Sequence, residues 1–103
     1  AANYLKNREY EKRILIIDLD VHQGNGNSEI FKNEKNVLTF SMHCSSNYPA
    51  KKSKSDIDIE LQDQMEDEKY LNILHKMCPH LLCLLPNLNL SELLIYQNPV
   101  SLP

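Results

Sequence analysis

Hydrophobic and polar positions along this chain fall into blocks that predict strands and helices in turn. The aliphatic run at 13–20, "RILIIDLD", has no polar alternation before its end, which is typical of a short central strand covered on both faces. A second β-rich run, "NVLTFSM", occupies 36–42. The strict alternation of "IDIEL" at 57–61 predicts a half-buried strand, and "LLIYQ" at 93–97 is the last strand candidate.

Three other segments have the composition and spacing of helices. Residues 3–11 resemble the end of a helix, and "GNGNSEIFKN" at 24–33 predicts a short one, with Asn27 or Ser28 as N-cap and Glu29 in the first turn. From residue 66 onward, apolar side chains recur at three and four residues: Tyr70, Leu71, Leu74, Met77, Cys78, Leu81, Leu82 and Leu85. Because Pro79 lies inside that pattern, we expect a kink or two short helices there.

The order of these segments predicts the fold class. Strand, helix, strand, loop, strand, helix, strand is typical of parallel βαβ units with right-handed crossovers, and therefore of an α/β fold with a mostly parallel sheet. Three or four strands and so few helices do not cover both faces of such a sheet. We therefore expect the chain to be a section of a larger α/β domain.

Composition narrows the class of protein. A chain of 103 residues with 42% hydrophobic residues and a net charge of -3 predicts at most one soluble domain and argues against nucleic acid as the main partner. No apolar run approaches the roughly 20 residues that span a bilayer, and the N-terminus lacks a secretory signal. We therefore expect an intracellular protein, and the sequence does not distinguish cytoplasm from nucleus. Cys44, Cys78 and Cys83 form no CxxC pair, which favours buried thiols in a reducing compartment.

The polar residues that end the first strand are the candidate chemistry. In open α/β sheets ligands bind beyond the carboxyl ends of the strands, where Asp18, Asp20 and His22 are expected. At about 3.3 Å per residue, Asp18 and His22 stand roughly 13 Å apart, too far to share an ion. Asp20 and His22 are only about 6.6 Å apart and can converge on one cation. A carboxylate with an imidazole suits zinc or a similar divalent metal in an open, catalytic site.

Other interpretations of the same letters stay open at this point. A histidine at a strand end is commonly just hydrogen-bonded, and DxH alone is weak evidence for a metal. The stretch "GNGNSE" lacks the third glycine of GxGxxG, which disfavours a dinucleotide site. An aliphatic strand ending in DxD also resembles the first motif of aspartate-nucleophile phosphohydrolases. That motif has Thr or Val at the position where this chain has His22.

A longer set of residues matches a known family. "RILIIDLDVHQGNGNSEIF", followed by "NVLTFSMHCSSNYPAKKSKSDIDIEL" and "DEKYLNIL", closely resembles the middle of zinc-dependent histone deacetylases and their bacterial acetoin-utilisation relatives. The form "HQGNG", with Asn25 where most of the family has aspartate, looks most like the class IV branch. The resemblance implies a partial, three-layer arginase/deacetylase-like fold. Residues 1–97 would be the central section of the catalytic domain, and 98–103 a diverged C-terminal tail.

The resemblance also implies roles for individual residues. Asp20 and His22 correspond to two of the three protein ligands of the catalytic zinc. Asp18 corresponds to the carboxylate that orients one of two adjacent catalytic histidines, and Asn25 stands where the partner of the other would be. The family also has an inner potassium site. Its ligands correspond here to the hydroxyl of Ser41 and to the backbone carbonyls of Asp18, Asp20, His22 and Met42. The implied cofactors are therefore Zn²⁺ and K⁺.

The implied reaction is the hydrolysis of acetyl-lysine amides, on a protein or a small acetylated amine. In the family, two adjacent catalytic histidines precede this strand, and the resemblance places them just before the first residue of this chain. A glycine-rich segment with a tyrosine follows later in the family, and it has no match in this chain. Ser101 stands where the third ligand, an aspartate, is expected. We therefore expect the isolated chain to be inactive. The alternative is a catalytically dead remnant or short isoform that binds a partner through uncovered strand edges.

Overall fold

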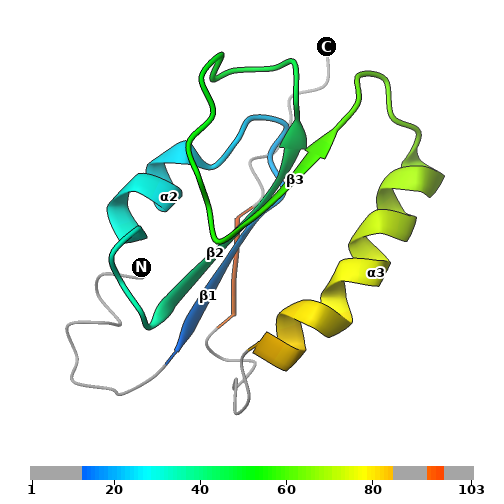
Figure 1. Cartoon of the computed structure of the whole chain (residues 1–103). Helices are drawn as coiled ribbons and strands as arrows, with labels where there is room; N and C mark the ends of the chain where they lie inside the picture. Colours follow the sequence, from blue (N-terminus) through cyan, green and yellow to red (C-terminus); the bar gives the residue numbers. More distant parts are fainter. Residues whose placement is uncertain (1–12, 85–92, 97–103) are drawn as a thin grey trace.

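The computed structural model describes residues 13–84 and 93–96, which form a four-stranded sheet with helices on its two sides (Figure 1). In chain order the elements are β1 (Ile14–Asp18), α2 (Asn25–Phe31), β2 (Val37–Cys44), β3 (Ile57–Leu61), α3 (Asp67–Leu84) and β4 (Leu93–Tyr96). The strand order is β3-β2-β1-β4, and each neighbouring pair is parallel. The predicted α/β fold is confirmed. The helix end expected at 3–11 lies outside the described residues.

β1 is the buried central strand that its aliphatic sequence predicts. Its residues alternate between two apolar clusters, because successive side chains of a strand point to opposite faces. The cluster on the α2 side comprises Ile14, Ile16, Phe31 and Val37. The cluster on the α3 side comprises Leu15, Phe40, Met42, Leu61 and Leu81. Figure 1 shows α2 on one side of the sheet and α3 on the other, which explains why both faces of β1 are apolar.

β2 differs from β1 in having one apolar and one polar face. Phe40 and Met42 face α3 and are each 1% exposed. The opposite face carries Thr39, Ser41 and His43, all of them buried. The polar side chains therefore lie on the side of the sheet that α2 covers, and they extend toward the carboxyl end of the strand.

The connection from β2 to β3 is a loop, although parallel neighbours are usually joined through a helix. We call residues 45–56 the crossover loop. Figure 1 shows it extending past the end of β2 and returning along the same side of the sheet as α2. Its last residue is tied to β2, since the Thr39 backbone N–H and hydroxyl both donate to Asp56 Oδ2, at 2.8 and 3.0 Å. Side-chain hydrogen bonds therefore replace the helix in holding this crossover to the sheet.

The start of α2 differs from the prediction. Gly24 is the N-cap, without a side-chain capping bond, so the assignment of Asn27 or Ser28 to that position is wrong. The Ser28 hydroxyl instead donates to the carbonyl of Asn25 at 2.9 Å, inside the first turn. Because the helix begins earlier than expected, Glu29 falls beyond the first turn, which contains no acidic residue.

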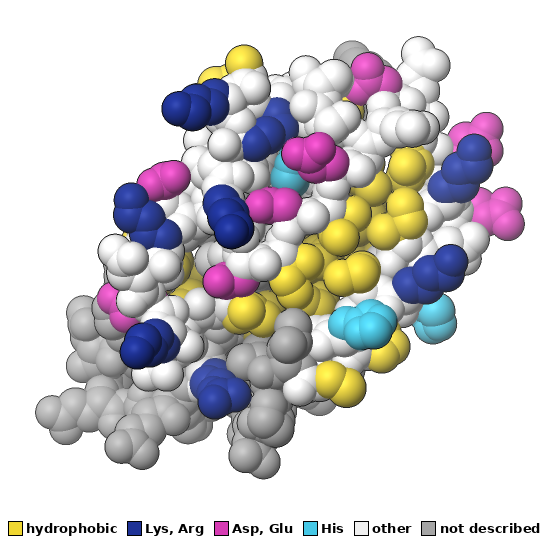
Figure 2. Space-filling view, in the orientation of Figure 1, with side chains coloured by type: hydrophobic (Ala, Val, Ile, Leu, Met, Phe, Trp, Pro, Cys, Tyr) yellow, Lys and Arg dark blue, Asp and Glu magenta, His cyan; other side chains and the backbone are white. Residues whose placement is uncertain are grey.

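α3 continues through Pro79, so the alternative of two short helices is wrong. Proline in a helix interior costs about 3 kcal/mol through one lost backbone donor and a local clash. That cost is offset because α3 packs on the sheet on both sides of Pro79, through Met77 before it and Leu81 after it. Figure 2 shows the resulting band of hydrophobic side chains along α3, with lysine and histidine side chains on its outer side.

The cysteines are less buried than expected. Cys78 and Cys83 are exposed and Cys44 is intermediate, so the prediction of buried thiols is wrong for the two on α3. The apolar stripe of α3 follows Ile73, Met77 and Leu81, and it leaves both cysteines beside the contact with the sheet. All three thiols are free. In the ranges 13–84 and 93–96, no helix has the length and apolarity needed to cross a membrane.

Candidate metal centre

The loop that follows β1 carries the predicted metal ligands at the carboxyl edge of the sheet. β1 ends at Asp18, and the chain reaches Gly24 before α2 begins. The backbone N–H of Cys44 donates to the carbonyl of Val21 at 2.9 Å, so the loop stays beside the end of β2. This is the position at which parallel α/β sheets bind ligands.

Asp20 and His22 converge as the spacing predicts. Asp20 Oδ1 lies 2.8 Å from His22 Nδ1, and it also accepts the backbone N–H of His22 at 2.8 Å. The Asp20 side chain is 14% exposed and the His22 side chain 50%, so the imidazole is accessible while the carboxylate is held inside the loop. The contact fits either the metal-ligand or the hydrogen-bonded interpretation of this pair.

Asp18 has a separate role in the loop. It is 6% exposed, and its Oδ1 accepts the backbone N–H of Asp20 at 3.0 Å. Burial raises the pKa of Asp18, and its hydrogen bonds to the Asp20 backbone and the Asn27 side chain only partly oppose this. The buried carboxylate therefore holds the backbone of Asp20, which fixes the starting point of the Asp20 side chain.

The polar face of β2 closes the inner side of the loop. The pairing of β1 with β2 puts Asp18 directly beside Ser41. The Ser41 hydroxyl accepts the backbone N–H of Gly24 at 3.1 Å and lies 3.0 Å from His43 Nδ1. Desolvation lowers the pKa of His43, which is 1% exposed, and its Nε2 has no hydrogen-bond partner within the described part of the chain. His43 therefore lies buried beside the serine that supports the loop, where desolvation favours the neutral form of its ring.

The structure brings together some, but not all, of the predicted site residues. Asn25 is the first residue of α2, where its backbone N–H donates to the carbonyl of Gln23 at 2.8 Å, and the role of its side chain stays a prediction. Among residues 13–84 and 93–96, no group of three or more His, Cys, Asp and Glu side chains is placed to hold a metal ion. Ser101 lies outside these ranges. The described residues therefore bring together only the two candidate ligands, Asp20 and His22.

Sequence reasoning missed the two buried polar residues that support this loop, Gln23 and His43. Both are almost fully buried, at 3% and 1% exposure. The alternation of Thr39, Ser41 and His43 with apolar neighbours was a usable signal for a buried polar face. For Gln23 the sequence holds no comparable signal, because its partners lie 30 and 35 residues away.

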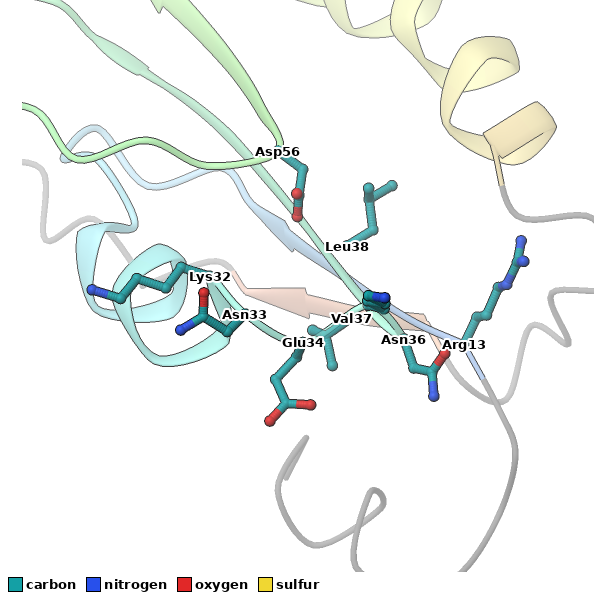
Figure 3. A pocket seen from close by; sticks show the side chains of 9 residues that line it. Arg13, Lys32, Asn33, Glu34, Asn36, Val37, Leu38 and Asp56 are labelled. Carbon is teal, nitrogen blue, oxygen red and sulfur yellow. The ribbon is translucent and has the colours of Figure 1, made fainter.

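A pocket of about 580 Å³ lies elsewhere, at the amino ends of the strands (Figure 3). Its lining includes Arg13 before β1, Val37 at the start of β2 and Asp56 before β3. Because the strands are parallel, this edge is the one opposite Asp20 and His22. This pocket is therefore distinct from the candidate metal centre.

Gly24 and Gly26 provide a matched test of the loop geometry. A Cβ atom at Gly24 would collide with Asp18 Oδ2, whereas one at Gly26 meets nothing within 4 Å. We expect Gly24→Ala to lower the free energy of unfolding by about 1–3 kcal/mol, as overpacking does. Gly26→Ala, inside α2, should be neutral or stabilising by up to about 1 kcal/mol. Urea unfolding of both variants measures the difference, and equal effects would contradict the described loop.

The buried carboxylate predicts a pH-dependent effect of Asp18→Asn. Burial raises the pKa of Asp18 above its unfolded value, so the folded state binds this proton more tightly than the unfolded state. The ionised carboxylate therefore destabilises the fold above the raised pKa. With a chelator present, Asp18→Asn should be more stable than wild type at pH 8, and the gap should shrink as the pH falls and Asp18 is protonated. A gap that is constant in urea unfolding from pH 8 to pH 4 would refute this.

Comparison with known proteins identifies the family. The family described as "Histone deacetylase domain" matches residues 1–91. An uncharacterized protein of Picosynechococcus sp. is 47% identical over 74 residues, which cover 72% of this chain and 25% of that protein. Histone deacetylase 8 of Xenopus tropicalis is 36% identical over 81 residues, covering 67% of this chain and 22% of the relative. Histone deacetylase 6 of Caenorhabditis elegans is 51% identical over 43 residues, covering 42% and 4%.

This chain thus spans a quarter or less of the length of these three relatives. The matched residues nevertheless include β1, α2, β2, β3 and α3, and with them the loop of Asp20 and His22. Since the family match covers most of the sequence, the chain belongs to the histone deacetylase family.

Proposed function

We propose that this chain is the central section of a zinc-dependent deacetylase that hydrolyses acetyl-lysine amides, with Asp20 and His22 as metal ligands. The observation that carries the proposal is the 2.8 Å approach of Asp20 Oδ1 to His22 Nδ1 at the carboxyl edge of a parallel sheet. Membership of the histone deacetylase family supports it. The substrate class is an acetylated lysine of a protein or a small acetylated amine.

The two side chains fit a zinc ion by donor type and by spacing. A carboxylate oxygen and an imidazole nitrogen are ordinary zinc ligands, and two ligand atoms on one tetrahedral zinc stand roughly 3.3 Å apart. The atoms here are 2.8 Å apart, so a small rotation of the half-exposed His22 ring would admit the ion. A zinc ion bound there would polarise an amide carbonyl and lower the pKa of a water molecule.

The surrounding residues of this chain hold the ligands in place. Asp18 fixes the backbone of Asp20, and this is the kind of support that a metal ligand needs from its neighbours. We also propose that Asp18 orients one catalytic histidine. Asn25 would stand where the partner of the other catalytic histidine is expected. The exposed edge of the His22 ring leaves the centre open to a substrate.

The same proposal includes a potassium ion behind the zinc site. Its ligands would be the carbonyls of Asp18, Asp20, His22 and Met42, together with the hydroxyl of Ser41. The register that pairs Asp18 with Ser41 supports this, because it brings the β1 and β2 halves of the set side by side. Such an ion would bind the end of β1 to the end of β2.

We further propose that the chain is class IV-like, with residues 1–97 as a section of a three-layer arginase/deacetylase-like domain and 98–103 as a diverged tail. Alone it would be inactive, because a catalytic zinc site normally has three protein ligands and the described residues bring two together. A second candidate is a binding role without catalysis. β3 and β4 are the outer strands of the described sheet, and outer strands offer backbone groups for pairing.

Zinc titration of the chain tests the proposed ligands. We expect weak, saturable binding that shifts the His22 ring signals in NMR spectra. His22→Ala and Asp20→Asn should each abolish it, because a single remaining ligand holds zinc poorly. His75→Ala is the matched control, since His75 lies exposed on α3 and should not alter binding. Equal loss in the control, or no loss in the ligand variants, would count against the assignment.

The catalytic part of the proposal is tested in a chimera. Residues 13–61 would replace the matching segment of the Xenopus tropicalis relative, and turnover of an acetyl-lysine peptide would be followed. We expect the folded chimera to be active with zinc, and its His22→Ala form to lose at least about 100-fold in turnover. The 103-residue chain should give no turnover. A folded, zinc-loaded but inactive chimera would favour the binding role instead.

A further inference from the structure

Gln23, next to the proposed ligand His22, makes an unusual set of contacts with the crossover loop. Its Nε2 donates to the carbonyl of Ser53 at 2.7 Å, and its Oε1 accepts the backbone N–H of the same residue at 2.8 Å. The second Nε2 hydrogen reaches Asp58 Oδ1 at 3.0 Å. One buried amide thus pairs with both backbone groups of Ser53, as a neighbouring strand would. Only a side chain that both donates and accepts can do this.

Asp58 links this contact to the sheet. It lies in β3, and its Oδ2 accepts the backbone N–H of Ser55 at 2.8 Å while its Oδ1 accepts from Gln23. Both carboxylate oxygens are therefore used to hold the end of the crossover loop and the loop after β1. Through Asp58, the crossover loop and the loop after β1 are therefore joined to each other and to β3.

The crossover loop also approaches the His22 ring, through Tyr48. Lys52, which precedes Ser53, donates through Nζ to the carbonyls of Asn47 and Pro49. These carbonyls flank Tyr48, whose ring centre lies 6.4 Å from that of His22 with the planes at 69°. Hydrogen bonds from Gln23 to Ser53 and from Lys52 to the residues on either side of Tyr48, joined by the intervening backbone, thus connect Gln23 to the segment that carries the aromatic ring.

We propose that Gln23 is a positioning residue for the metal centre. Its amide holds the loop of Asp20 and His22 against the crossover loop, so that the imidazole is kept between the Asp20 carboxylate and the Tyr48 ring. This inference rests on the proposed zinc function and adds to it. It assigns the orientation of His22 to a residue that contacts neither the metal nor the substrate.

The full chain with labelled histidine and tyrosine rings provides the test. Three quantities are measured: the ring-to-ring NOE between His22 and Tyr48 without metal, the Zn²⁺ dissociation constant, and the free energy of unfolding in urea. Gln23→Met keeps the length of the side chain and removes its three hydrogen bonds. We expect it to lose the NOE and to raise the dissociation constant by about tenfold, as loss of a supporting hydrogen bond does at metal sites.

Thr39→Val is the matched control, because it breaks the hydroxyl bonds that tie Asp56, the last residue of the same loop, to β2. It should destabilise the chain, keep the NOE and leave zinc affinity within about twofold. A rescue experiment starts from Gln23→Glu, which places a second carboxylate beside that of Asp58. Adding Asp58→Asn then restores an amide donor between the two side chains. The double variant should regain part of the NOE that Gln23→Glu loses.

The outcomes separate this inference from the proposed function. Equal changes in zinc affinity for Gln23→Met and Thr39→Val at matched stability would mean that Gln23 only stabilises the loop, and would overturn the inference. If wild type shows the NOE but no zinc-dependent shift at His22, the zinc proposal fails. The NOE comparison then still decides whether Gln23 positions the ring. An NOE that survives in Gln23→Met also overturns the inference.

Discussion

The parallel pairing of β1 with β2 places Asp18 beside Ser41, and the rest of the candidate centre depends on that register. A shift of one residue would turn the polar side of β2 toward α3 and bury it against leucine and methionine side chains. The apolar alternation prevents this, since Phe40 and Met42 complete the cluster on the α3 side. Packing on one face of the strand therefore sets the position of the polar groups on the other.

The polar layer between the sheet and α2 carries a cost in stability. Asp18 and His43 are both buried, and desolvation shifts the pKa of each toward its neutral form. An apolar layer would avoid this penalty. The hydrogen bonds from Asp20 to Asp18 and from Gly24 to Ser41 offset part of it, and they hold the loop to the ends of β1 and β2. Groups that are already held in place bind a ligand more tightly than groups that must first be ordered.

Local patterns in the sequence were enough to predict the strands, the α/β class and the meeting of Asp20 with His22. Each of these follows from contacts a few residues apart. The N-cap of α2 was misplaced because Gly24 has no capping side chain, and the serine that resembled a cap bonds within the helix. The continuity of α3 through Pro79 depends on tertiary packing, which a local rule does not include. The contacts of Gln23 were unpredictable for the same reason, since they join separate parts of the chain.

A crossover built as a loop has a consequence for how members of this family can diverge. A helix in that place would commit most of its residues to packing on the sheet. The side chains of Thr39, Gln23 and Asp58 all hold the crossover loop within residues 53–56, where it leads into β3. Insertions between the end of β2 and these anchors cost little in loop-closure entropy. The segment beside the His22 ring can therefore change length and shape while the strands and their register stay the same.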